Sequence, residues 1–76
     1  GLVLFQKGLY KEALKFFIKA NSINNSDKII IEHLGDAYSK LNEKAVALNW
    51  WEKAASIGQP SDILLKKIKT NTYYEE

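Results

Sequence analysis

Three charged side chains in the middle of the chain have a spacing that could form a binding surface. Glu32, Asp36 and Lys40 lie four residues apart, so on a helix they project from one face. Such a face could contact a ligand directly. The same spacing also describes a solvated helix face whose charges pair with one another, at a few tenths of a kcal/mol per pair. Because charge patterning of this kind is common on exposed helices, the second interpretation is favoured.

A metal or catalytic role would have to start from His33, with Asp36 three residues further on. The chain has one His and no Cys, whereas protein metal sites usually need three or four such ligands. The sequence also lacks a nucleophile–base pair and a Gly-rich phosphate loop. We therefore expect no enzymatic activity, no metal and no cofactor.

A basic stripe runs along Lys11, Lys15 and Lys19, again at four-residue spacing. A nucleic acid or an anionic membrane surface is one alternative partner for it. However, the net charge is only +2 and all 11 basic residues are Lys, so the planar Arg fork that suits phosphate is missing. A solvated helix face is the better interpretation, and we expect no nucleic-acid partner.

Size and composition indicate one small soluble domain. The 76 residues are 46% hydrophobic and 26% charged, and a chain this short buries only about 60% of its unfolded surface. No apolar run approaches the roughly 18 residues of a membrane span, so we expect no membrane insertion. The N-terminus lacks the basic region of a signal peptide. Since it begins without Met and inside an apolar pattern, we expect a piece of a longer chain.

The chain repeats itself at a spacing of 34 residues without any insertion. The aromatic pair 16–17 falls on the pair Trp50 and Trp51. Helical periodicity alone does not make Gly, Ala and aromatic-pair positions coincide, so two copies of one structural unit are indicated. The other coincident pairs are Gly1 with Gly35, Ala13 with Ala47, Leu14 with Leu48, Lys19 with Lys53, Ala20 with Ala54, Ser22 with Ser56, Ile23 with Ile57 and Ile29 with Ile63.

Apolar residues three and four positions apart predict five helices. The expected ranges are residues 1–7, 10–22, 28–41, 43–57, and a last helix from 62 that fades by 71–74. Gly8 and Asn42 tolerate the left-handed conformation that ends a helix, and Gly58 ends the fourth. The polar run 24–27 and Ser61 offer N-cap oxygens.

These motifs resemble the tetratricopeptide repeat (TPR) family, whose 34-residue helix–turn–helix unit has a W-x2-L-G-x2-Y, A-x3-F, A and P pattern. The proline departs from it: Pro60 comes one residue late, and Asn25 stands where the first copy would have one. The matching residues are Ile31, Leu34, Gly35, Tyr38, Ala47, Trp51 and Ala54 in the second copy, and Gly1, Leu4, Gly8, Ala13, Phe17 and Ala20 in the first.

The resemblance implies an all-α solenoid of antiparallel helix pairs, forming a single domain over residues 1–76. Its parts would be a truncated repeat (1–27), a complete repeat (28–61) and a C-terminal capping helix with its tail (62–76). The last part is similar to the closing repeat and capping helix of some bacterial TPR proteins. That likeness leaves the compartment open between the bacterial cytoplasm and the periplasm or cell envelope.

By the same resemblance, the first helix of each pair lines a concave side that binds a protein or peptide partner. TPR proteins that grip a C-terminal carboxylate carry Lys, Arg and Asn where this chain has Glu32 and Asp36, so it does not resemble a chaperone-tail binder. Further positions on this side are Leu2, Gln6, Ile63, Thr70 and Tyr74. The partner-binding candidates are Phe5, Ile29, Glu32, Asp36, Ser39, Lys40, Lys66 and Tyr73.

Two functions remain open at this point. The chain is either the end of a TPR array that binds a partner on its concave face, or a purely structural cap whose binding repeats lie upstream, since repeat arrays need such caps. Residues 2–5 are expected to lack part of their cover, which predicts self-association through the N-terminal end.

Trp50 and Trp51 cannot both point inward, because neighbouring residues on a helix are about 100° apart. Trp51 stands at the A-x3-F position and is expected in the core. Trp50 either packs on the last helix or marks a contact surface, and the same ambiguity applies to Tyr73 and Tyr74.

Overall fold

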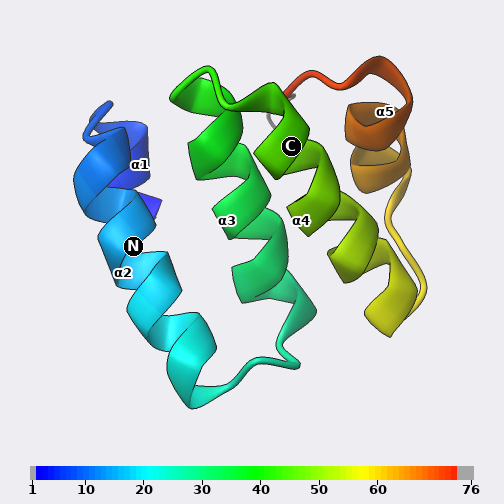
Figure 1. The fold of residues 1–76 in the computed structure, drawn as a ribbon, viewed down its shortest axis with the longest axis horizontal. Coiled ribbons are helices and arrows are strands. Elements are labelled where there is room, and N and C mark those ends of the chain that lie inside the picture. Colours follow the sequence, from blue (N-terminus) through cyan, green and yellow to red (C-terminus); the bar gives the residue numbers. More distant parts are fainter. Residues whose placement is uncertain (1, 74–76) are drawn as a thin grey trace.

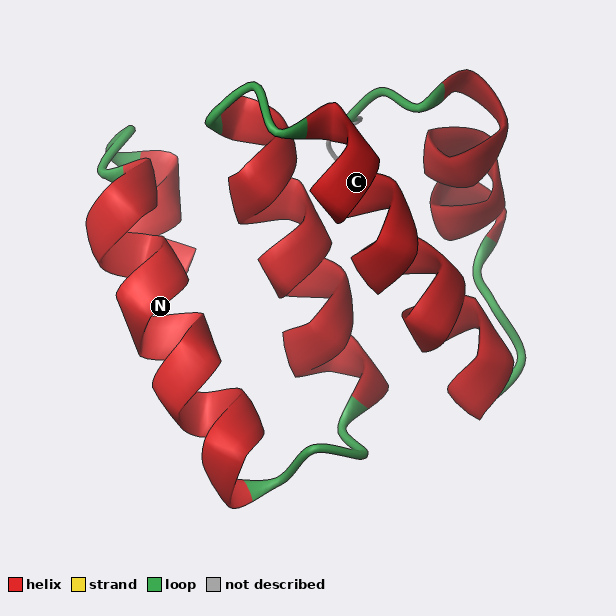
Figure 2. Ribbon diagram, in the orientation of Figure 1, coloured by secondary structure: helices red, strands yellow, loops and turns green. Residues whose placement is uncertain are grey.

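The computed structural model describes residues 2–73, with side chains from residue 4 onward. This part of the chain contains no strand and forms five helices, α1 (Leu2–Gln6), α2 (Tyr10–Ile23), α3 (Lys28–Lys40), α4 (Lys44–Ile57) and α5 (Asp62–Thr70) (Figures 1 and 2). The expected all-α fold is confirmed, and the bounds of α2, α3 and α4 lie within one residue of those expected. Gly1 and Tyr74 lie outside the described residues.

The turns use the residues that the sequence singled out. Gly8 has φ +80°, and Asn42, which takes its place in the second copy, has φ +65°. The carboxylate of Asp27 accepts hydrogen bonds from the backbone N–H groups of residues 29 and 30 at the start of α3. Likewise Ser61 Oγ accepts one from the N–H of Leu64 at 3.1 Å. These caps satisfy backbone donors that a helix leaves unpaired at its first turn.

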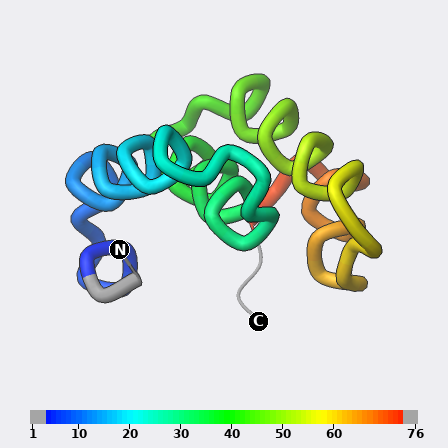
Figure 3. The backbone as a smooth tube through the Cα atoms, turned by 90° about the horizontal axis from the view of Figure 1, so that it is seen from below, coloured from blue at the N-terminus to red at the C-terminus, as the bar shows by residue number. Residues whose placement is uncertain are grey.

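The helices lie in two layers (Figure 3). Helices α2 and α4 run along one side, while α1, α3 and α5 form the other, which we call the inner side. Each helix packs on its neighbours in the chain, as in a linear array of helical units. None of the helices in the described part of the chain combines the length and apolar character needed to cross a bilayer.

The contact between α3 and α4 depends on Gly35 and Trp51. Trp51 is fully buried, as expected for the A-x3-F position, and its counterpart Phe17 is 3% exposed. A Cβ atom added to Gly35 would overlap the Trp51 indole. The close approach of the two helices therefore requires glycine at this position.

Trp50 packs against α3. Its ring stacks on that of Tyr38, with the centroids 6.5 Å apart and the planes at 5°, and the ammonium of Lys53 lies 5.4 Å from its centroid. Neither Tyr38 nor Lys53 was identified from the sequence as its partner.

Helix α5 contacts α3 through a different face from the one that the repeat predicts. A spacing of 34 residues aligns Lys66 with Glu32 and places it on the inner side. In the structure Leu64 and Lys67 are buried, whereas Lys66 is exposed. The contact with α3 is consequently made one position further along, by Lys67.

Candidate functional site

Lys67 is the buried centre of the inner side. Its side chain is 2% exposed, and its Nζ donates hydrogen bonds to Glu32 Oε2 at 2.8 Å and to Asp36 Oδ1 at 2.9 Å. The two acceptors belong to α3 and the donor to α5. Lys67 therefore joins the last helix to the complete repeat by a two-armed ion pair, which we call the lysine clamp (Glu32, Asp36 and Lys67).

The clamp keeps Lys67 charged. Burial is the largest single influence and lowers the pKa of Lys67, because the ammonium loses its hydration. The charge of Asp36, the hydrogen bonds to both carboxylates and the charge of Glu32 act in the opposite direction, and together they raise the pKa above the ordinary 10.5. The site is thus built around a cation that its own carboxylates neutralise.

Asp36 requires a correction to the sequence-based interpretation. The sequence predicts this residue on an accessible binding face or, alternatively, on a solvated self-paired face, but it is only 5% exposed. Its Oδ1 also accepts a hydrogen bond from the indole N–H of Trp51 at 3.0 Å. The solvated alternative is wrong for this residue, and Asp36 serves packing between three helices.

His33 lies at the edge of the same network. Its Nδ1 is 3.5 Å from Asp36 Oδ2, and its ring stacks on Phe17 with centroids 5.2 Å apart. Within the described residues, no group of three His, Cys, Asp or Glu side chains could hold a metal ion. The histidine packs α3 on α2.

Two predicted partner-binding residues, Phe5 and Lys40, come together around a third, Tyr73. Its ring centroid lies 5.4 Å from that of Phe5, and the ammonium of Lys40 lies 4.7 Å from it. Tyr10, which the sequence did not single out, completes the group, with its ring 5.2 Å from Phe5 in an edge-on arrangement. Phe5, expected to lack cover, is consequently only 9% exposed, so that expectation is wrong for this residue.

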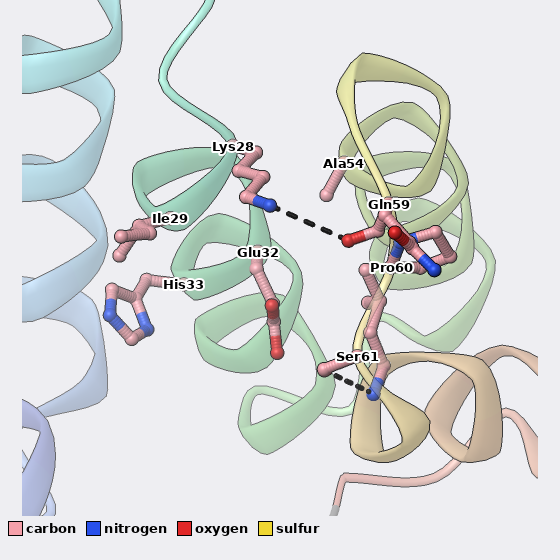
Figure 4. A pocket seen from close by; sticks show the side chains of 9 residues that line it. Lys28, Ile29, Glu32, His33, Ala54, Gln59, Pro60 and Ser61 are labelled. Atoms are coloured by element: carbon pink, nitrogen blue, oxygen red, sulfur yellow. Dashed lines mark hydrogen bonds between the residues drawn. The ribbon is translucent and has the colours of Figure 1, made fainter.

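A pocket of about 430 Å³ opens at the other end of the inner side, between α3 and the segment that joins α4 to α5 (Figure 4). Ile29 is 61% exposed at its edge. The ammonium of Lys28 crosses the pocket and donates a hydrogen bond to the backbone oxygen of Gln59 at 3.4 Å. The lining residues are Lys28, Ile29, Glu32, His33, Ala54, Gln59, Pro60, Ser61 and Leu64.

The predicted site residues thus separate into two places. Ile29 and Glu32 line the pocket, whereas Phe5, Lys40 and Tyr73 form the aromatic group. Ser39 is half-buried and Lys66 exposed. Lys67 was missed because the repeat spacing pointed to its neighbour, although its position three residues after Leu64 on the apolar face of α5 is a usable signal.

The helices, their packing on chain neighbours and the shared core position of Phe17 and Trp51 define an all-α helical-repeat protein. Residues 1–27 match the family model of the tetratricopeptide repeat. Such repeats are generally non-catalytic, and their usual role is protein–protein interaction. No curated protein and no solved structure matches the chain.

Proposed function

We propose that the chain is a non-catalytic interaction module that binds an extended segment of a partner protein on its inner side. The observation that carries this proposal is the pocket between α3 and the segment that joins α4 to α5, with an exposed isoleucine beside charged groups. The family match of residues 1–27 supports the general role. In the solenoid that the repeat implies, the inner side would be the concave side.

The lining of the pocket suits one apolar side chain flanked by polar groups. Ile29, Leu64 and Pro60 supply apolar surface from three parts of the chain. Lys28 and Glu32 place opposite charges one helical turn apart at its rim. Binding sites commonly combine an apolar anchor with a few polar groups that fix orientation. The partner residue that fits here is a branched aliphatic one.

A second function is supported by the lysine clamp. Lys67 fixes α5 on α3, and Leu64 is buried beneath it, which is what a helix that closes a repeat array must do. In this alternative, α5 is a purely structural cap and partner binding belongs to repeats upstream. The N-terminal end, where α1 pairs with α2, is then the surface on which those repeats, or a second copy of the chain, would stack.

One substitution separates the two functions. Random short peptides displayed on phage are first selected on the unaltered protein, and the enriched ones are measured against Ile29→Asp. We expect these peptides to lose binding to Ile29→Asp and to keep it for Ile18→Asp, a matched change at an exposed isoleucine of α2. Equal binding to both variants, or no enriched peptide at all, would overturn the pocket as the binding site and favour the cap.

A further inference from the structure

We propose that Phe5, Tyr10 and Lys40 form a binding site for an aromatic side chain of the partner, and that Tyr73 of the chain itself occupies this site until the partner displaces it. The proposal rests on the proposed protein-binding function and names a second partner residue. The three residues come from different helices, α1, α2 and α3.

The aromatic rings around Tyr73 have the distances and angles of favourable aromatic pairs. Its ring is tilted by 58° to Phe5 at 5.4 Å between centroids, and Tyr10 meets Phe5 edge-on at 67°. Tilted and edge-on pairs at such distances are favourable because the positive edge of one ring meets the negative face of the other. The rings of Phe5 and Tyr10 therefore offer a surface made for a third aromatic ring.

Two ammonium groups add a preference for rings over aliphatic side chains. Lys40 lies 4.7 Å and Lys67 5.2 Å from the centroid of Tyr73. A cation within about 6 Å of an aromatic centroid is attracted to the ring face. An aliphatic side chain in the same place would lose this attraction, so the site selects tyrosine or another electron-rich ring.

The residues that form the site lie on helices, whereas Tyr73, which occupies it, does not. Phe5 and Tyr10 stand on helices, and Lys40 is the last residue of α3. Tyr73 follows the end of α5 at Thr70, after Asn71 in the left-handed conformation with φ +50°. Segments beyond the last turn of a helix open at a lower free-energy cost than the helices themselves. Because Tyr73 alone of these residues stands outside a helix, we expect its displacement to cost less free energy than opening of the helices that form the site.

The test uses two probe peptides, Gly-Ser-Tyr-Ser-Gly and the same peptide with Leu in place of Tyr. Removing the internal occupant by Tyr73→Ser should raise the affinity for the tyrosine peptide about tenfold, because the competing bound state is lost. Tyr73→Phe is the matched control, since its ring still fills the site, and it should bind as weakly as the unaltered protein. Equal affinity of Tyr73→Ser and the unaltered protein would overturn the proposal, as would equal binding of the two peptides to Tyr73→Ser.

A measurement on the unaltered protein does not depend on the folding of any variant. Saturating tyrosine peptide should move the ring NMR signals of Tyr73 toward those of an exposed tyrosine and perturb those of Phe5 and Tyr10. Displacement would be refuted if the peptide binds and leaves the Tyr73 signals in place. It would also be refuted if no binding is detected at the highest peptide concentration. Ile29→Asp keeps the two proposals apart: it should leave this response unchanged, because Ile29 lines the other pocket.

Discussion

The indole N–H of Trp51 and the ammonium of Lys67 both donate to the same oxygen, Oδ1 of Asp36, at 3.0 and 2.9 Å. Asp36 thereby connects α3 to α4 and to α5 at once. A buried carboxylate is tolerated when it is paired and hydrogen-bonded, and Asp36 is both. Reversing the charges of Glu32 and Asp36 together, which looks from the sequence like a test of partner binding, would therefore release α5 instead.

Replacing Lys67 by Met should lower the free energy of unfolding by about 3 kcal/mol. Removal of one partner from a buried ion pair leaves the other charge uncompensated, and Asp36 is 5% exposed. Lys69→Met, at an exposed position of the same helix, is the matched control and should change stability by less than about 0.5 kcal/mol, as exposed sites usually do. Urea titrations followed by tryptophan fluorescence measure both. Equal midpoints for the two variants would show that Lys67 does not hold α5 in place.

The loss in Lys67→Met should be largely recovered when the carboxylates are neutralised as well. Adding Asp36→Asn and Glu32→Gln removes the buried charge while the shapes of the side chains are kept, and neutral replacements of buried ion pairs are often tolerated. The triple variant should therefore unfold at a urea concentration closer to that of the unaltered protein than Lys67→Met does. If neutralising the carboxylates recovers no stability relative to Lys67→Met, the loss comes from packing of the lysine stem rather than from charge balance.

Alkaline pH should weaken the clamp in a defined direction. Since the pKa of Lys67 is raised by folding, the folded state holds its proton more tightly than the unfolded chain. The resulting stabilisation is fully present below the ordinary lysine pKa of 10.5 and is lost as pH rises through the higher folded value. The difference in unfolding free energy between the unaltered protein and Lys67→Met should stay constant from about pH 8 to about pH 10 and fall above that. A difference that grows above pH 10.5 would contradict the sign of the shift.

The turns and the core were accessible to sequence analysis because each depends on local chemistry. Gly8 and Asn42 tolerate positive φ, and Phe17 and Trp51 recur at one position of a 34-residue unit. Because the unit repeats every 34 residues, the core positions of the first copy predict those of the second. Small residues mark the positions where two helices approach closely.

The lysine clamp and the aromatic group could not be predicted from the sequence, because they depend on contacts between distant parts of the chain. A lysine is usually solvated, and Lys67 is buried only because Glu32 and Asp36 meet it from 35 and 31 residues away. Tyr73 follows the last helix and contacts Phe5 near the other end of the described chain. No local pattern contains either pairing.

Asn42 gives a test of the turn between α3 and α4. With φ +65°, it stands where Gly is least strained and residues with a Cβ pay a steric cost. Asn42→Ala should lower the unfolding free energy by about 1 kcal/mol, since Asn tolerates this conformation better than Ala does. Asn42→Gly should be neutral or stabilising. Thermal unfolding of both variants measures the effect, and an Asn42→Ala protein as stable as Asn42→Gly would contradict a left-handed turn.

Gly35 gives the sharpest test of the interface between the two helices of the complete repeat. At an unconstrained helix position, Gly→Ala stabilises by roughly 0.5–1 kcal/mol, because Ala has the higher helix propensity. Here the added methyl group would overlap the five-membered ring of Trp51, so Gly35→Ala should destabilise by about 1–3 kcal/mol. In a Trp51→Ala background the overlapping atoms are gone, and the same substitution should cost less. A double-mutant cycle of urea midpoints measures this coupling, and simple additivity would mean that the glycine and the indole do not meet.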